Sequence, residues 1–471
     1  MAAQMSQKTL QRQNMMLTEP LPKVILQMAY PTIISFLINQ IYSLADTYFV
    51  SGLGTNAAAA VSVNASLDQV IMMAGSLLAI GATSYISRLL GSGQQEKASQ
   101  VLSTAFYTAM AFGLIVAVLG FAFMDPMVTL LGATATCKEY AIDYATYVLL
   151  VAPFMTATFV MNQCLRGEGS ALLSMVGMSI GGILNCILDP IFIMDWCLGL
   201  GVAGASIATA ISKMVSFSIL IYPYLRKKTV LHLSIRLFTL SKDIIYQIAT
   251  VGSSSLFRNG LAVLSAIILN NIAGNMSDSV LAGVGITNKI MMFPFAVILG
   301  FSSGFQPVAG FNWGAKRFDR VKESYRFAAR VALLVSAAMG VVIFIFAENI
   351  IGLFTETDAE MMRFGMLCIR LQCIAMPVHG WVAIVNMLCA GLGYASFAVA
   401  LSTARQGTCF LPIVHLMAHL GGENGIAAVQ AVADILTLIL AIPILRIVQG
   451  RIQKALEAFE RETASSAETG G

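Results

Sequence analysis

The sequence predicts an all-α integral membrane protein with twelve transmembrane helices in two six-helix lobes. Of its 471 residues, 57 % are hydrophobic and only 11 % are charged, whereas water-soluble domains contain roughly 25 % charged residues. The apolar residues also form runs of about 20 or more, the length of helix that crosses the hydrocarbon core of a bilayer. A third feature, an internal repeat, predicts the two lobes.

Twelve apolar segments are long enough to span a membrane as helices. They lie at 24–50, 57–84, 99–124, 140–165, 171–194, 202–225, 244–274, 279–311, 324–347, 361–390, 394–420 and 424–448. The spans at 244–274 and 279–311 are long enough to tilt or to extend beyond the bilayer.

The charges of the connecting loops predict the orientation of these spans. The connection at 226–243 holds five Lys or Arg residues, whereas the connection at 348–360 holds four acids and no basic residue. The same alternation runs along the whole chain, with basic loops after even-numbered spans. Because cytoplasmic loops are enriched in Lys and Arg, both termini are expected in the cytoplasm and the chain in a plasma or inner membrane.

The two halves of the sequence match when the first half is shifted by 223 residues, a separation that we call the repeat offset. This shift puts Ala59 on Ala282 and Gly81 on Gly304. Each half holds six spans, an even number, so both halves enter the membrane in the same direction. Repeats of this kind are related by a pseudo-two-fold axis along the membrane normal and carry a substrate path between them.

The repeat and the loop charges together divide the chain into five segments. These are a cytoplasmic tail at 1–22, an N-lobe at 23–225, a basic cytoplasmic linker at 226–243, a C-lobe at 244–450 and a second cytoplasmic tail at 451–471. A two-lobed transporter follows from this organisation.

A charge within a span is costly and indicates a function, and we consider ten ionisable residues of the predicted spans as candidates. They are Asp46, Asp68, Asp189, Lys213, Arg258, Lys289, Arg370, His379, Arg405 and Asp434. Packed ion pairs, or side chains that reach the membrane interface, explain most of these residues as well as a function does. The sequence assigns no role to Asp68, Arg258, Arg370, His379, Arg405 or Asp434.

Asp46 and Asp189 are the strongest candidates for a functional site. Asn185 precedes Asp189 by four residues, which places the amide and the carboxylate on one helix face. Pro190 has no N–H, so the carbonyl of Cys186 remains available as an acceptor. Such oxygen atoms suit a proton or a small hard cation, and buried neighbouring carboxyl groups can bind and release a proton near neutral pH.

The two acids have no counterparts in the second half of the chain. At the repeat offset Asp46 matches Leu269, and Asp189 matches Leu411 or Pro412. Symmetric packing of the lobes therefore does not require these acids, and we expect them to bind the coupling ion. A sodium site at Asp46, Asn185 and Asp189 is the corresponding metal hypothesis.

The sequence contains no complete motif for ATP hydrolysis and no motif in the context that hydrolytic catalysis needs. GxxxxGK[ST] and HExxH are absent, and the GxSxG matches, at 177–181 and 300–304, lie inside the predicted spans 171–194 and 279–311. A catalytic GxSxG serine sits on a strand-to-helix turn, so we expect neither an ATP-driven pump on this chain nor an enzyme. No cofactor is expected beyond a coupling H⁺ or Na⁺. Gln40, Tyr42 and Met291 are candidate substrate contacts, and we expect a monomer that binds small molecules and lipid but no nucleic acid.

From about residue 22 to residue 450, the chain resembles the multidrug and toxic compound extrusion (MATE) family. It resembles most the branch that holds the DNA-damage-inducible transporter and the staphylococcal multidrug exporter. The motifs that carry the resemblance are Pro31 with QIYSLADTYFVSGLG, TSYISRLLGSG at 83–93, LRGEGS at 165–170, NCILDPIFI at 185–193, GVAGASIATAIS at 201–212 and GFQPVAGFNWGAK at 304–316.

The resemblance implies a transporter that exports cationic amphiphilic drugs in exchange for inward-moving H⁺ or Na⁺. It also implies the residues of a cation site in the first lobe, which are Asp46, Asn162, Asn185, Asp189 and Thr209. Pro31 matches a proline that the family uses for helix bending. No acid of the second lobe aligns with the one that other branches use, which favours coupling through the first lobe.

Two other functions compete with drug export. A lipid-linked oligosaccharide flippase of the same superfamily would have extra spans and a more basic cavity. A membrane-embedded enzyme would need a nucleophile or a metal cluster, and the sequence shows neither.

Overall fold

The computed structural model describes residues 14–194, 197–354 and 358–469, and all regular structure in these ranges is helical. Eleven helical stretches are long and apolar enough to cross a membrane. The last of them, Ala395–Ser465, contains two spans, because Gly422 has a non-helical backbone (φ 52°, ψ −130°). This break lies between the predicted spans 394–420 and 424–448, so the twelve-span membrane fold is confirmed.

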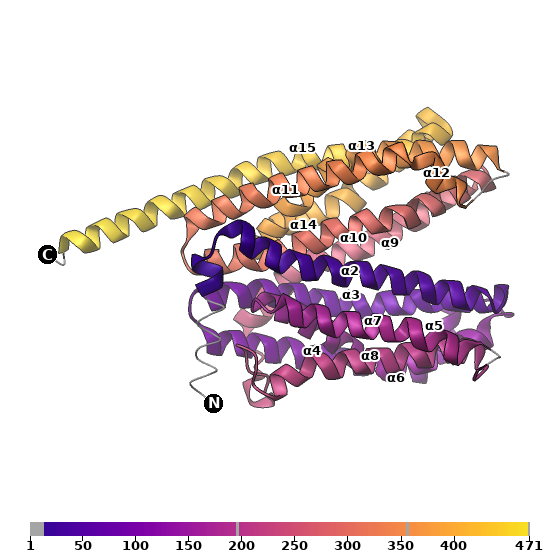
Figure 1. The fold of residues 1–471 in the computed structure, drawn as a ribbon, viewed down its shortest axis with the longest axis horizontal. Coiled ribbons are helices and arrows are strands. Elements are labelled where there is room, and N and C mark those ends of the chain that lie inside the picture. The colour runs from indigo at the N-terminus through magenta and orange to yellow at the C-terminus, as the bar shows by residue number, and fades with distance from the viewer. Residues whose placement is uncertain (1–13, 195–196, 355–357, 470–471) are drawn as a thin grey trace. The chain divides into compact units, whose positions relative to one another are not determined.

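The helices form two compact units. The first unit contains Tyr30–Gly252, and the second contains Met15–Ala29 and the described residues from Ser253 onward. The helices of the first unit, drawn from indigo to magenta in Figure 1, are α2 (Leu21–Ser51), α3 (Thr55–Gly91), α4 (Gln95–Ala122), α5 (Met124–Leu130), α6 (Lys138–Gly167), α7 (Ala171–Ile193) and α8 (Gly201–Leu225), with the short 3₁₀ turn η1 (Ile235–Leu237).

The second unit repeats this order of helices. Its elements are α9 (Lys242–Gly274), α10 (Asp278–Gly314), α11 (Phe318–Ile345), α12 (Ala347–Gly352), α13 (Ala359–Leu392), α14 (Ala395–Thr403), the π-helical turn η2 (Ala404–Thr408) and α15 (Phe410–Thr469). The C-terminal end of α15 extends past the other helices of its unit (Figure 1).

The helix boundaries show the internal repeat directly. The starts of α3 and α10 are separated by the repeat offset, and so are their ends; the same is true of α4 and α11. Even the short helices α5 and α12, which follow α4 and α11, begin at positions separated by this offset. Since helix ends depend on capping residues and packing partners, this agreement indicates that the two units fold by the same local rules.

Helices α2 and α9 each belong to both units. Helix α2 begins in the second unit and enters the first after Ala29, and α9 begins in the first unit and enters the second after Gly252. Ala29 and Gly252 are themselves separated by the repeat offset. Each unit therefore contains the start of the first helix of the other half of the chain.

Glycines allow these exchanged helix starts to pack closely. A Cβ atom at Gly81 on α3 would lie 2.1 Å from the carbonyl oxygen of Ile248 on α9. A Cβ atom at Gly304 on α10 would lie 2.5 Å from the Cα atom of Ala29 on α2. Small residues that let helix backbones approach are the usual basis of helix packing in membranes.

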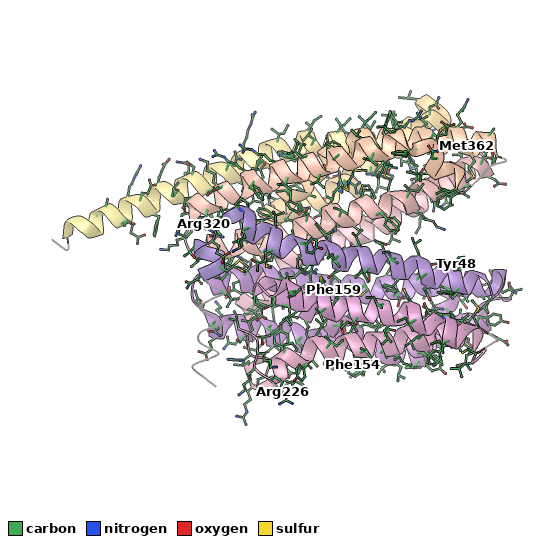
Figure 2. The ribbon with its side chains drawn as sticks, in the orientation of Figure 1. Tyr48, Phe154, Phe159, Arg226, Arg320 and Met362 are labelled. Carbon is green, nitrogen blue, oxygen red and sulfur yellow. The ribbon has the colours of Figure 1, made fainter. Side chains whose placement is uncertain are left out.

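Polar contacts hold the segment before α2 within the second unit. Arg320 of α11 donates hydrogen bonds from Nη2 to the carbonyl oxygens of Met16 (3.3 Å) and Glu19 (2.8 Å), and from Nε to Asn312 (3.1 Å). Figure 2 shows Arg320 beside the start of α2.

The basic segment 226–243 runs along α4 rather than away from the bundle. Ser99 and Ser103 of α4 accept hydrogen bonds from the backbone N–H groups of His232 (3.1 Å) and Ser234 (3.3 Å). Thr104 both donates to and accepts from the backbone of Thr239 (3.0 and 3.3 Å). The segment that connects the two halves of the chain is thus part of the first unit.

We expect Gly304→Ala to destabilise the protein, because the new methyl group would overlap the backbone of Ala29. Overpacking of this kind costs about 1–3 kcal/mol. Gly285→Ala on the same helix is the matched control, since a Cβ atom there would meet nothing within 4 Å, and alanine stabilises a helix interior relative to glycine. Thermal melting of the purified variants measures the difference, and equal melting temperatures would contradict the close contact.

Candidate functional site

Helix α7 places Asn185 and Asp189 side by side in the interior of the first unit. The Asn185 amide donates hydrogen bonds to Asp189 Oδ1 (3.2 Å) and to Thr209 Oγ1 on α8 (3.2 Å). Asn185 and Asp189 are only 2 % and 0 % exposed. The predicted spacing of four residues therefore places both groups on a buried helix face, and Thr209 joins them.

Helix α2 brings Asp46 to this pair. Gly182 of α7 lets α2 approach, since a Cβ atom there would lie 3.0 Å from Ile38 Cγ2 and 3.6 Å from Tyr42 Cδ1. One turn beyond Tyr42, the charge of Asp46 interacts with that of Asp189. Three predicted site residues on α7 and α8 thus share one region with a fourth on α2.

Asp68 of α3 is a further acid of this cluster. Its charge interacts with that of Asp46, and both side chains are half-buried. The sequence placed Asp68 within a span but gave it no role. The structure therefore shows three carboxyl groups in this cluster where the resemblance implied two.

Four oxygen atoms of the cluster accept no hydrogen bond from another described residue. They are Asp46 Oδ1, Asp68 Oδ1, Asn185 Oδ1 and Asp189 Oδ2, and all are buried. Buried polar atoms in proteins are nearly always partnered. These oxygens can bind a proton or, being hard ligands, coordinate a small cation.

Lys213 of α8 supplies the positive charge of the cluster. Its Nζ atom donates a hydrogen bond to the Tyr42 hydroxyl (3.1 Å) and lies 5.0 Å from the centre of the Tyr42 ring. Its charge also interacts with those of Asp46 and Asp68. Lys213 follows Thr209 by four residues, which is the same helical spacing that identified Asn185 and Asp189, so the sequence did contain the signal.

A small cavity of about 30 Å³ adjoins these groups. Its lining includes Tyr42, Thr158, Asn185, Thr209 and Lys213, together with Phe159, which is labelled in Figure 2. A space of this size holds a water molecule or a small ion, so the cavity is too small for a drug molecule.

The structure does not place Asn162 in the cluster. Its amide oxygen accepts a hydrogen bond from the hydroxyl of Ser174 on α7. Ser174 precedes Asn185 by eleven residues, so Asn162 contacts α7 at a point about 16 Å along the helix from Asn185. Asn386 is the counterpart of Asn162 in the second half of the chain, and it too bonds a serine, although in the opposite direction: its amide N–H donates to the Ser402 hydroxyl (2.8 Å). Each unit thus pairs this asparagine with a serine, which is the contact that the structure gives Asn162 in place of the cluster.

Thr158 is the polar α6 residue that lines the small cavity, one turn before Asn162. Its hydroxyl oxygen is buried and has no hydrogen-bond partner among the described residues. The resemblance implies Asn162 on this helix, and in the structure the polar α6 side chain at the cavity is that of Thr158.

The remaining predicted residues lie in different surroundings. Pro31 lies inside α2, two residues after Ala29, and its carbonyl accepts a hydrogen bond from Ser35 (3.0 Å). Gln40 is half-buried on α2. Met291 is 1 % exposed in an apolar cluster with Ile298, so it packs in the core of the second unit.

The described residues include no group of three His, Cys, Asp or Glu that could hold a metal ion. A sodium ion at Asp46, Asn185 and Asp189 would therefore depend on amide and hydroxyl oxygens as well as on carboxylates. The donor set fits such an ion, because sodium, like other hard cations, takes oxygen ligands of these kinds.

Comparison with known proteins identifies the family. The MatE family model matches residues 31–191 and again residues 255–414. The chain belongs to the MATE family. The starts of the two matches are separated by the repeat offset to within one residue, as the internal repeat predicts.

Relatives of known name support this assignment over nearly the whole chain. The multidrug export protein MepA of Staphylococcus aureus (strain MSSA476) is 26 % identical over 434 residues, which cover 92 % of this chain and 95 % of MepA. MepA of Staphylococcus saprophyticus is 26 % identical over 431 residues, covering 91 % and 94 %. An outward-facing multidrug resistance MATE family transporter of the MOP superfamily matches with a TM-score of 0.88 and 25 % identity, covering 93 % of this chain and 98 % of that one.

These relatives are transporters and not enzymes. The membrane-embedded enzyme is therefore excluded as an alternative, and the chain is a multi-pass membrane transporter.

We expect Asn162→Ala to lower stability by about 1–3 kcal/mol, the cost of losing a buried hydrogen bond, while the ion coupling of transport is retained. Asn386→Ala, the matched change in the second unit, should have a similar effect. Melting temperature and the ion dependence of transport are measured on both variants. Loss of coupling at unchanged melting temperature in Asn162→Ala would place Asn162 in the ion site after all.

Proposed function

We propose that the chain exports cationic amphiphilic small molecules across a cell membrane in exchange for inward-moving H⁺ or Na⁺. The observation that carries the proposal is the carboxylate cluster of the first unit, in which Asp46, Asp68 and Asp189 each keep one buried oxygen without a hydrogen-bond partner. The names of the MepA relatives support multidrug export as the activity.

The charges of the cluster suggest why an ion must bind there. Three carboxylates face one ammonium group, that of Lys213, and a net negative charge within a membrane-spanning bundle is unstable unless it is neutralised. Uptake of protons or of a sodium ion removes this cost. The ion then favours the conformation in which the oxygens are closest together, and a ligand can shift a conformational equilibrium only through such differential binding.

Coupling is assigned to Asp46 and Asp189, with Asn185 and Thr209 as hydrogen-bonding partners. Asn185 holds Asp189 Oδ1, so that Oδ2 is the atom left to bind the ion. Asp46 lies on α2, the helix that extends into both units. Ion binding at Asp46 therefore acts on a helix that can transmit the change to the second unit.

Pro31 gives α2 a place at which to bend. A proline within a helix removes one backbone hydrogen bond and weakens the helix there. Pro31 lies just after the point where α2 passes from the second unit to the first. We assign to it the bending of α2 when the ion binds.

The orientation follows from the loop charges. The Lys and Arg residues of the 226–243 segment support a cytoplasmic location for that side of the protein, and for both termini with it. The protein then acts as a monomer, moving substrates out of the cell and lowering the internal concentration of toxic compounds, including antibiotics.

We expect Asp46→Asn and Asp189→Asn each to abolish ion-driven export while the protein is still made and folded. The asparagine side chain keeps the size of the aspartate but cannot bind a proton or balance a sodium charge. Efflux of a fluorescent organic cation from cells is measured in the presence of a proton gradient, a sodium gradient, or neither.

Asp125→Asn is the matched control for these variants, since the Asp125 side chain is 67 % exposed and lies outside the cluster. Normal efflux in both Asp46→Asn and Asp189→Asn would show that the first unit does not couple transport. Unchanged accumulation of a broad panel of drugs in cells with the unaltered protein would exclude drug export itself.

We expect Pro31→Ala to slow export by roughly tenfold or more without preventing ion binding, because the substitution restores the helical hydrogen bond that proline removes. Ion binding is measured separately from transport by the thermal stabilisation that sodium or a lower pH gives the purified protein. An unaltered transport rate would argue against bending at this residue.

A further inference from the structure

The second unit contains a larger cavity, of about 210 Å³, lined by α9, α10, α13, α14 and η2. It occupies the position in the repeat that the small cavity occupies in the first unit. Equivalent positions of the repeat line both cavities. His379 of the larger cavity corresponds to Met155 of the small one, and Arg405 corresponds to Gly181, each pair being separated by the repeat offset to within one residue. The two units thus have equivalent cavities with different side chains.

Basic and aromatic side chains line the larger cavity. The equivalent positions of the small cavity hold neither basic nor aromatic residues. Arg258, His379 and Arg405 all contribute to its lining, with Phe295 between them, where the small cavity has Met72. The ring of Phe295 lies 5.0 Å from that of His379 and 4.8 Å from the Arg405 guanidinium carbon. Arg258, His379 and Arg405 come from three elements, α9, α13 and η2, and all face this one cavity.

The π-helical turn η2 places Arg405 at this cavity. A π-helical turn within an α-helix often marks a functional site. Gly407 of the same turn packs against α9, where a Cβ atom would lie 2.6 Å from Leu261. The close approach of η2 and α9 brings Arg405 to the same cavity as Arg258.

Arg405 is only partly neutralised. Its Nε atom donates to Asp434 Oδ1 (2.6 Å), and Gln430 donates to the same oxygen (3.4 Å). This ion pair is the packed kind that the sequence analysis considered for both residues. The Nη2 atom of Arg405, however, is buried without a hydrogen-bond partner.

Arg258 has no neutralising partner among the described residues. No hydrogen bond or ion pair of its guanidinium group occurs in that part of the chain, although the group lines the cavity. His379 Nδ1 is likewise buried and without a partner, and the residue is 8 % exposed. Two guanidinium groups and one carboxylate leave the cavity with an excess positive charge, so its polar atoms are matched to an anion.

We propose that this cavity binds the carboxylate group of an aromatic organic acid, with Arg258 as the main anchor, Arg405 Nη2 as a second donor and Phe295 in contact with the ring of the acid. Guanidinium groups bind carboxylates through paired, charge-assisted hydrogen bonds. The volume is below that of pockets which enclose whole drug-sized ligands, so the cavity holds one end of a larger molecule.

The inference rests on the proposed function in treating this acid as part of the exported molecule. The substrates would then include amphiphiles that carry both a cationic and an acidic group. The two equivalent cavities would have separate tasks, with the acidic cluster of the first unit binding the coupling ion and the basic cavity of the second binding cargo.

The test compares 2-naphthoate with its methyl ester, which has the same ring but no charge. Binding of each is followed by fluorescence on the purified full chain in nanodiscs of phosphatidylcholine. We expect the acid to bind more tightly than the ester. Arg258→Gln should weaken binding of the acid by roughly tenfold or more, the effect of losing a hydrogen bond to a charged group, and leave binding of the ester unchanged.

Three variants make the result specific. The double variant Arg405→Gln with Asp434→Asn removes the second donor without leaving Asp434 unpaired, and it should also weaken acid binding. Arg370→Gln is the matched control, because Arg370 lies over Phe344 and does not line the cavity. In Asp46→Asn, which abolishes coupled export, the acid should still bind more tightly than the ester, which separates this proposal from the proposed function.

Equal affinity for acid and ester, or equal losses in Arg258→Gln and Arg370→Gln, would overturn the carboxylate site. Nanodiscs that contain phosphatidylglycerol provide a further test. Displacement of 2-naphthoate by this lipid in the unaltered protein, but not in Arg258→Gln, would identify the anion as a lipid headgroup and overturn the assignment to cargo.

Discussion

The cost of keeping three carboxyl groups inside a helix bundle in lipid is the constraint on which the structure of the first unit depends. Asp46, Asp68 and Asp189 come from three helices, α2, α3 and α7, so their mutual repulsion acts between helices and not within one. Asn185, Thr209 and Lys213 reduce that repulsion but do not remove it. The coupling ion of the proposed function would offset the repulsion that remains.

The second constraint is the close packing at Gly81 and Gly304. These glycines hold the exchanged starts of α9 and α2 against helices of the opposite half. Because α2 extends into both units, a change in its direction near Pro31 would reach both of them. Asp46, one of the two proposed coupling residues, lies on the part of α2 that follows Pro31.

Much of this organisation could be predicted from the sequence. The twelve spans follow from apolar runs, and the repeat predicted the equal helix boundaries of the two units. The spacing of Asn185 and Asp189 predicted their shared face, because only local helical geometry is involved. The packing of one helix on another could not be predicted in this way. Asn162 was assigned to the ion site from a resemblance, but its partner Ser174 lies on a neighbouring helix. Likewise, the sequence placed Arg258, His379 and Arg405 within spans, and only folding showed that they share a cavity.

The exchange of helix starts between the two units bears on how such a chain could have arisen. If the chain were cut within the 226–243 segment, neither half could complete its unit. The second unit would lose Met15–Ala29, which lies in the first half of the chain. The first unit would lose the residues up to Gly252, which lie in the second half. An ancestor with a single copy of the repeat would reach the same packing only as a swapped homodimer, in which each subunit lends the start of its first helix to its partner. Gene duplication followed by fusion would preserve that arrangement within one chain. Once fused, the two halves could diverge, so that one carries the buried acids and the other carries arginines at different positions of the repeat.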